Sequence, residues 1–319
     1  MRRIPAVIAV VGLSALALVG CSSAPAAAGC ERPDAGSSAL GLVKAGGEPG
    51  SPTISLTDPV YAQSTSFTDE TVGEGPVVTA QTQDVVFSIA IANGATGAPI
   101  LETVTPVRSV DFWTTDYAGF ATMLDCATEG SRIVGAVPYD QLSEQAAANW
   151  DIQEGQSIAV VMDVQKVYKA AADGAPQYND RRGMPAVVLA PDGRPGIIIP
   201  DGAPPQDLAA EVLKKGDGEK VGAGDAIRVQ YTGVNWADKK VFDSTWEKGA
   251  STALSLDAVV PGFAQALDGQ TVGSQILVVI PPELGYGDQA TGAVPANSTL
   301  VFVVDILGVD APAADTSGQ

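Results

Sequence analysis

Histidine is absent from the chain, and basic residues are few. Without a histidine among its 319 residues, the protein lacks the commonest side-chain general base and the commonest metal ligand. Metal catalysis and a Ser-His-Asp hydrolase are therefore disfavoured, and we expect no metal and no cofactor. The 18 Lys and Arg residues against 37 Asp and Glu residues give a formal net charge of −19. Such an acidic surface repels phosphate backbones, so nucleic-acid binding is not expected.

A long apolar run occurs only at the N-terminus. Arg2 and Arg3 precede an apolar run from Ile4 to Val19. This run is shorter than the roughly 20 residues of a spanning helix but is typical of a signal sequence. It leads into Leu-Val-Gly-Cys at 18–21, which resembles a bacterial lipobox, in which Cys21 is lipid-modified and becomes the first mature residue. The alternative is an ordinary cleavable signal with a chance cysteine. A lipobox implies an extracytoplasmic lipoprotein anchored to the outer face of the cell membrane.

Cysteine is also scarce, with three residues in the chain. If Cys21 carries lipid, Cys30 and Cys126 remain. Two leftover cysteines often pair in an oxidising compartment. We therefore hypothesise a disulfide that joins the start of the first domain to its own core. Two free, buried thiols are the alternative.

The chain contains an internal repeat. The segments FATMLDCATEGSRIVGAVP (120–138) and FAQALDGQTVGSQILVVIP (263–281) share nine of nineteen residues without gaps. We predict an α+β fold of two like modules, each an antiparallel sheet curled around one short helix. In the second copy the helix should begin near Pro261, because proline fits the first helical turn. The similarity extends to strand-like segments on both sides, at 85–94 and 159–167 in the first copy and at 227–233 and 301–309 in the second.

The segment between the two copies is rich in Pro, Gly and Asp. Within it, AVVLAPDGRPGIIIP (186–200) has two apolar runs around Pro-Asp-Gly, which indicates a β-hairpin. We expect this hairpin to pack between the domains. The predicted organisation is a signal peptide over 1–20, a flexible tether over 21–38, a first module over 39–169, a linker with the hairpin over 170–205, a second module over 206–311 and a disordered tail over 312–319.

Five short motifs follow one another in the second copy. They are VQYTG (229–233), VFDSTW (241–246), VVPGF (259–263), PPELGYGD (281–288) and PANSTLVFVVDIL (295–307). Each motif alone is unspecific, but this order, with the expected elements between them, resembles the FKBP-type peptidyl-prolyl cis/trans isomerases. The resemblance covers about the last 105 residues. It implies an enzyme that rotates Xaa–Pro bonds in extended polypeptide clients without a cofactor.

The resemblance also implies a set of site residues. Asp243 and Tyr286 would supply the polar groups next to the rotating bond, while Phe242 and Tyr231 would form walls. Phe263 would be the floor. The remaining substrate contacts would come from Val259, Val260, Val294, Phe302 and Leu254. Taken singly, the aromatic residues also fit a plain strand core, Asp243 a turn, and Tyr286 an exposed loop.

Two observations qualify the resemblance. Leu254 stands where the family usually has an aromatic residue, so one rim of the pocket is less aromatic. In the first copy the motif positions hold other residues. Ile91 is expected at the position equivalent to Tyr231, and Leu101-Glu102 at the positions equivalent to Phe242-Asp243. Only Phe120 keeps its floor position. We therefore predict a non-catalytic first module.

Two functions from different classes fit these observations. The first is a lipid-anchored prolyl isomerase, monomeric because coiled-coil heptads are missing, that acts on secreted or cell-envelope proteins. The second is an extracytoplasmic chaperone or binding lipoprotein that holds proline-containing ligands and isomerises them incidentally. Retention of Asp243 and Tyr286 favours the enzyme.

Overall fold

The computed structural model describes residues 30–33, 35–179 and 181–310. The predicted signal peptide, the lipidation site at Cys21, most of the predicted tether and the predicted tail lie outside these residues. Within the described part of the chain, no helix is long and apolar enough to cross a membrane.

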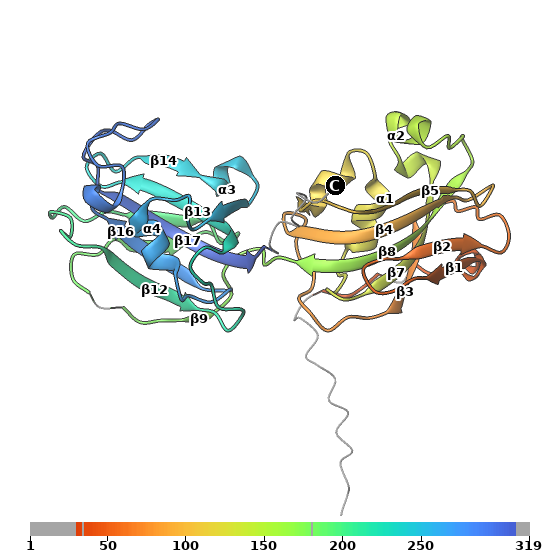
Figure 1. The fold of residues 1–319 in the computed structure, drawn as a ribbon, viewed down its shortest axis with the longest axis horizontal. Coiled ribbons are helices and arrows are strands. Elements are labelled where there is room, and N and C mark those ends of the chain that lie inside the picture. The colour runs from red at the N-terminus through yellow and green to blue at the C-terminus, as the bar shows by residue number, and fades with distance from the viewer. Residues whose placement is uncertain (1–29, 34, 180, 311–319) are drawn as a thin grey trace, which may run out of the picture. The chain divides into compact units, whose positions relative to one another are not determined.

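Both halves of the chain form antiparallel sheets that pack against a short helix, α1 in the first module and α4 in the second, as the repeat predicts (Figure 1), and each module has one further short helix. The first sheet has the order β3-β7-β8-β4-β5, with β6 also paired to β4. Its helix α1 (Ala118–Leu124) buries Phe120. The other elements of this module are β3 (Ser66–Thr71), β4 (Asp84–Asn93), β5 (Pro99–Val104), β6 (Arg108–Ser109), β7 (Arg132–Pro138), α2 (Glu144–Asn149) and β8 (Ser157–Val167).

The second sheet repeats this order as β12-β16-β17-β13-β14, and β9 extends it beyond β12. The α+β class and the two-module fold predicted from the sequence are therefore confirmed. The elements of the second module are β9 (Ala175–Pro176), β12 (Ala209–Lys215), β13 (Ala226–Asn235), β14 (Val241–Ser244), α3 (Thr245–Lys248), β15 (Thr252–Ser255), α4 (Pro261–Leu267), β16 (Gln275–Ile280) and β17 (Leu300–Val309).

Helix α4 begins at Pro261, as predicted. Proline occupies the first helical position, where its missing N–H breaks no hydrogen bond. Phe263 and Leu267, four residues apart, are buried on one face of the helix. They pack with strand residues of the same module such as Val229 and Val304. This core fixes the helix against one face of the sheet.

A β-hairpin accompanies each sheet. The hairpin of β1 (Val43–Gly46) and β2 (Thr53–Leu56) packs its apolar residues against Val134 and Val161 of the first sheet. The predicted hairpin of β10 (Ala186–Leu189) and β11 (Pro195–Ile198) likewise packs against apolar residues of the second sheet. The expectation that this hairpin packs between the domains is wrong: its apolar contacts are with the second module.

The registers correct one sequence expectation about the first module. Tyr231 pairs with Val304 in the second sheet, and Ile89 pairs with Met162 at the equivalent position in the first. Ile89, and not Ile91, is therefore the residue of the first module that is equivalent to Tyr231. A bulge in β8, at Gln165, and another in β17, at Leu307, fix these registers and are not visible in the apolar pattern.

Candidate active site

Three aromatic side chains of the second module lie around a fourth, Phe302. The Phe302 ring centroid lies 5.2 Å from that of Phe263, 5.4 Å from that of Phe242 and 6.0 Å from that of Tyr231. All three pairs are edge-to-face, the arrangement that aromatic quadrupoles favour. Phe263 on α4 and Phe302 on β17 are almost fully buried, whereas Tyr231 and Phe242 are only partly buried. The cluster therefore has a buried floor and a partly exposed side.

Gly233 lets these rings approach one another. A methyl group at this position would lie 2.7 Å from Cζ of Phe242 and 2.8 Å from Cε1 of Phe302. Any side chain on Gly233 would displace one of the two rings. The glycine of the YTG motif is thus required by packing between segments that are distant in the sequence.

A β-bulge directs two neighbouring residues toward the site. Gly233 pairs with Asp243 and Val234 with Val241, so Phe242 is the extra residue on β14. Successive side chains of a regular strand point to opposite faces. At this bulge, Phe242 contacts the Phe302 ring while the next residue, Asp243, contacts Tyr231. Bulges commonly re-aim side chains next to active sites.

The polar groups of the site form a short chain of charge-assisted contacts. The hydroxyl of Tyr231 donates a hydrogen bond of 2.5 Å to Oδ2 of Asp243. The Nζ atom of Lys248 lies 2.5 Å from Oδ1 of the same carboxylate. Thr245, at the start of α3, accepts a hydrogen bond of 2.8 Å from the backbone N–H of Tyr231. Helix α3 therefore holds both polar residues of the rim.

These contacts shift two pKa values in opposite directions. Burial raises the pKa of the Tyr231 phenol well above its usual value, and the Asp243 carboxylate raises it further. Partial burial alone would raise the pKa of Asp243, but the hydrogen bonds from Lys248 and Tyr231 outweigh it and hold that pKa below its usual value. Around neutral pH the pair is therefore a neutral phenol donating to an ionised carboxylate.

The structure places the other predicted residues around this cluster. Val259, Val260 and Leu254 are partly buried against the same core, and Val294 is fully buried there. Tyr286, in the loop after β16, is 37% exposed. Within the described residues, the backbone N–H of Val260 donates no hydrogen bond. The apolar residues of the predicted set thus belong to one cluster, with Asp243 hydrogen-bonded to Tyr231 at its partly exposed side.

Sequence reasoning missed the two residues of α3 that contact the rim. Lys248 follows Asp243 by five residues, and Thr245 follows it by two. Both lie in the four-residue helix α3, which brings them back toward β13. A lysine shortly after the FDS motif was the one available signal, and it is weak because lysine is common in surface turns.

The first module fills the equivalent position with its own side chains. Phe120 stacks on Tyr117, with ring centroids 5.3 Å apart and planes 8° apart. Trp150 lies 5.0 Å from Tyr117 and 6.4 Å from Phe120. The apolar Ile89 stands where the second module has Tyr231. Aromatic residues therefore cover the floor, and the hydroxyl of the rim pair is missing.

Cys30 and Cys126 are both disulfide-bonded in the structure. Their Sγ atoms and a carboxylate oxygen of Asp125 lie within 4.8 Å of one another. Because the sulfur atoms are oxidised, this group offers no thiolate for a metal ion.

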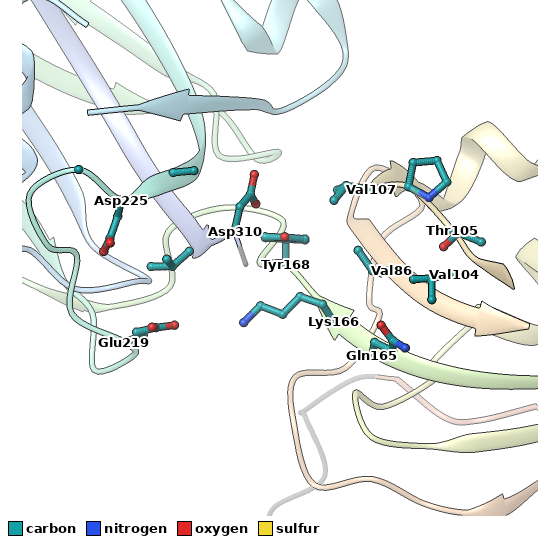
Figure 2. Close-up of a pocket in the computed structure, with 14 residues that line it drawn as sticks. Val86, Val104, Thr105, Val107, Gln165, Lys166, Tyr168, Glu219, Asp225 and Asp310 are labelled. Atoms are coloured by element: carbon teal, nitrogen blue, oxygen red, sulfur yellow. The ribbon is translucent and has the colours of Figure 1, made fainter. Parts of the chain in front are cut away.

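A separate cavity of about 1090 Å³ lies away from the aromatic cluster. Figure 2 shows side chains that line it, among them Lys166, Tyr168 and Asp310. None of the site residues predicted from the sequence lines this cavity, so it does not belong to the candidate site.

Comparison with known proteins finds relatives of the second module. The family model of the FKBP-type peptidyl-prolyl cis-trans isomerases matches residues 217–307. A probable FK506-binding protein of Corynebacterium glutamicum is 32% identical over 36% of this chain and 97% of its own length. An FK506-binding protein of Streptomyces anulatus is 35% identical over 36% of this chain and 97% of its own length.

Longer proteins match over part of their length. The FKBP-type peptidyl-prolyl cis-trans isomerase FkpA of Escherichia coli is 40% identical over 35% of this chain and 42% of its own. Its crystal structure matches with a TM-score of 0.32 at 34% identity, over 42% of this chain and 54% of that chain. Because two relatives more than 30% identical are matched over almost their whole length, the chain belongs, through its second module, to the FKBP-type peptidyl-prolyl cis-trans isomerases.

Proposed function

We propose that the second module accelerates rotation about Xaa–Pro bonds in secreted or cell-envelope polypeptides, using the aromatic cluster as its binding pocket. The observation that carries the proposal is the meeting of four aromatic rings with the Tyr231–Asp243 pair at their rim. Rotation costs about 18–20 kcal/mol because amide resonance is lost. No covalent bond is broken, so the site needs no nucleophile, base or metal.

The site lowers this barrier by binding the twisted amide more tightly than either planar form. A twisted amide has less charge separation than a planar one, so an apolar pocket that excludes water favours it. Phe263 and Phe302 form the buried part of this pocket, against which the proline ring packs. Asp243 lies beside the carbonyl of the rotating bond, and Tyr286 donates to a client carbonyl. The free N–H of Val260 is a further donor to the client backbone.

The first module does not catalyse the reaction. Tyr117 and Trp150 occupy the space above Phe120 where a proline ring would enter. The equivalent of Tyr231 is Ile89, which has no hydroxyl. This module serves as a spacer or as a surface that holds the client.

We also propose that the protein is an extracytoplasmic, monomeric lipoprotein anchored through Cys21. The charged and apolar N-terminal pattern supports a signal, and the disulfide-bonded Cys30 and Cys126 support an oxidising compartment. Mass spectrometry of the N-terminal peptide tests the anchor, because lipid on Cys21 adds a defined mass. In a Cys21→Ser variant this mass disappears, and the protein leaves the membrane fraction.

The activity is tested with a tetrapeptide that contains one Leu-Pro bond. The purified protein should accelerate its cis-to-trans exchange, and Asp243→Leu and Tyr286→Phe should each reduce kcat/KM by at least tenfold without changing the circular dichroism spectrum. Asp257→Asn, at an exposed position outside the pocket, is the matched control and should retain full activity. No acceleration by the well-folded protein would refute the enzyme and leave a proline-binding lipoprotein.

A further inference from the structure

Helix α3 holds the polar rim of the pocket although it is only four residues long. Thr245 and Lys248 are three residues apart, so they share one side of the helix. Thr245 accepts a hydrogen bond from the backbone N–H of Tyr231, and Lys248 contacts the carboxylate of Asp243. A helix of about one turn has little stability of its own. Its position therefore depends on packing from another side.

Trp246 provides this packing, against the β10–β11 hairpin. A methyl group placed on Gly193, in the turn of the hairpin, would lie 3.2 Å from Cη2 of Trp246 and 3.1 Å from Cβ of Ala171. The indole ring thus lies directly against the backbone of the turn. Its Nε1 atom is buried and has no hydrogen-bond partner among the residues that the structure describes. The contact between Trp246 and the hairpin is therefore one of packing.

The hairpin is a firm support for this ring. Val187 and Ile197, one on each strand, pack against a buried cluster of the second module. Within the turn, the backbone N–H of Gly193 donates a hydrogen bond of 2.9 Å to the carbonyl of Ala190. The hairpin precedes residues 217–307, which match the family model. The support of α3 by the hairpin is therefore a feature of this chain outside the family-matched part.

We propose that Trp246 is a positioning residue of the isomerase, which packs against the hairpin turn, fixes α3 and keeps Lys248 on the carboxylate of Asp243. The proposal rests on the proposed isomerase function, because Asp243 serves catalysis only in that function. Without the Trp246 ring, α3 loses its support on the hairpin side. Lys248 then leaves the carboxylate more often, and its charge stabilises ionised Asp243 less.

The pKa of Asp243 reports the position of Lys248. Burial would raise this pKa, but hydrogen bonds from Lys248 on α3 and Tyr231 on β13 hold it below its usual value. Tyr286, in the loop after β16, is the next titratable group and adds to the raised pKa of the Tyr231 phenol, which burial and Asp243 mainly cause. Of these groups, only Lys248 is carried by the helix that Trp246 supports.

The experiment measures the pKa of Asp243 in the full chain by NMR of its carboxyl carbon. Trp246→Ala removes the ring, whereas Trp246→Phe keeps an aromatic ring and removes the unpaired N–H. Lys248→Ala gives the shift that follows complete loss of the contact. Val212→Ala is the control for a general loss of stability, because Val212 is partly buried in the same module on β12, at the far side of the sheet from β14.

We expect Trp246→Ala to raise the pKa of Asp243 by most of the shift that Lys248→Ala produces. Trp246→Phe and Val212→Ala should leave it unchanged. The double variant of Trp246→Ala and Lys248→Ala should have the same pKa as Lys248→Ala alone, since the two changes act through one contact. The acid limb of kcat/KM for the Leu-Pro tetrapeptide should move with this pKa. An unchanged pKa in Trp246→Ala, an equal shift in Val212→Ala, or additive shifts in the double variant would overturn the proposal.

Gly193→Ala tests the same contact from the hairpin side and decides the question if Trp246→Ala does not fold. The added methyl group presses on the Trp246 ring, so the pKa of Asp243 should rise. Gly183→Ala is the matched control, because Gly183 has a similar φ of +83° against +92° but a methyl group there meets nothing within 4 Å. Equal effects of the two glycine variants would assign the shift to backbone strain and reject the role of Trp246.

Failure of the isomerase function has a different signature. In that case the unchanged protein does not accelerate exchange of the tetrapeptide at any pH. The NMR measurement is independent of activity and still decides whether Trp246 keeps Lys248 on Asp243. A shifted pKa in an inactive protein would therefore refute the isomerase but not the contact.

Discussion

Tyr231 and Asp243, on neighbouring strands, are joined by a hydrogen bond of 2.5 Å from the phenol to the carboxylate. Lys248 holds the other oxygen of the carboxylate, and the rings of Phe263 and Phe302 contact the Tyr231 ring. The polar rim and the aromatic floor of the site therefore share one residue. A substitution in either part should therefore alter the geometry of the other part through Tyr231.

Removal of Lys248 should move the acid limb of activity to higher pH. The pKa of Asp243 lies below its usual value, although its burial opposes this, because Lys248 and Tyr231 stabilise the carboxylate. A carboxylate whose pKa is lowered on folding stabilises the folded protein above its unfolded-state pKa. This stabilisation is lost as the pH falls through the folded-state pKa. In Lys248→Ala we expect Asp243 to protonate at higher pH, so that kcat/KM falls earlier on acidification.

The control for this variant is Lys240→Ala, which removes the same charge from an exposed position just before β14. Its pH profile should match that of the unchanged protein. If the two lysine variants gave the same profile, the specific contact between Lys248 and Asp243 would not be responsible.

Gly233→Ala should impair the site through packing. The added methyl group would lie within 2.8 Å of both Phe242 and Phe302, so one ring must move. We expect kcat/KM to fall at least tenfold and stability to fall by about 1–3 kcal/mol, the usual cost of overpacking. Gly202→Ala, where a methyl group meets nothing within 4 Å, should leave kcat/KM unchanged. Retained activity of Gly233→Ala would show that the rings can rearrange without loss of function.

The hairpin should contribute to the stability of the second module. Ile197 packs against the buried cluster beneath the hairpin, whereas its neighbour Ile198 is exposed. We expect Ile197→Ala to lower the free energy of unfolding by about 1–2 kcal/mol, because its side chain is partly buried. Ile198→Ala should change it by less than about 0.5 kcal/mol. Urea unfolding monitored by circular dichroism measures both, and equal values would mean that the hairpin is loosely attached.

Loss of the disulfide should destabilise the first module without affecting catalysis. Cys30 and Cys126 are far apart in the sequence, so a bond between them closes a long loop worth about 4–5 kcal/mol in the chain-entropy description. We expect Cys126→Ser to lower the unfolding temperature of this module while kcat/KM for the tetrapeptide stays constant. Alkylation of the unreduced protein should modify neither cysteine. Addition of two alkyl groups to Cys30 and Cys126 would show that no bond forms.

Local patterns in the sequence predicted the main features of the fold. The repeat around Phe120 and Phe263 predicted two like modules, and both sheets have the same strand order. Pro261 predicted the start of α4 because proline fits a first helical turn. The Pro-Asp-Gly segment predicted the β10–β11 hairpin. These features depend on residues that are close in the sequence, which is why the sequence alone was sufficient to predict them.

Other features depend on contacts between distant segments. The bulges in β8 and β17 set the registers that make Ile89 the equivalent of Tyr231, and a bulge in β14 brings Phe242 and Asp243 to the same site. The contact of Lys248 with Asp243 and the packing of the hairpin on the second sheet also arise only in the folded chain.

The sequence by itself thus determined which residues are available for the site and in which order they occur. The tertiary structure decided how they face one another. The physical reason is that strand side chains alternate with a period of two, so a shift of one residue, such as a bulge, turns the following side chains to the other face. Only the pairing with a partner strand fixes that choice.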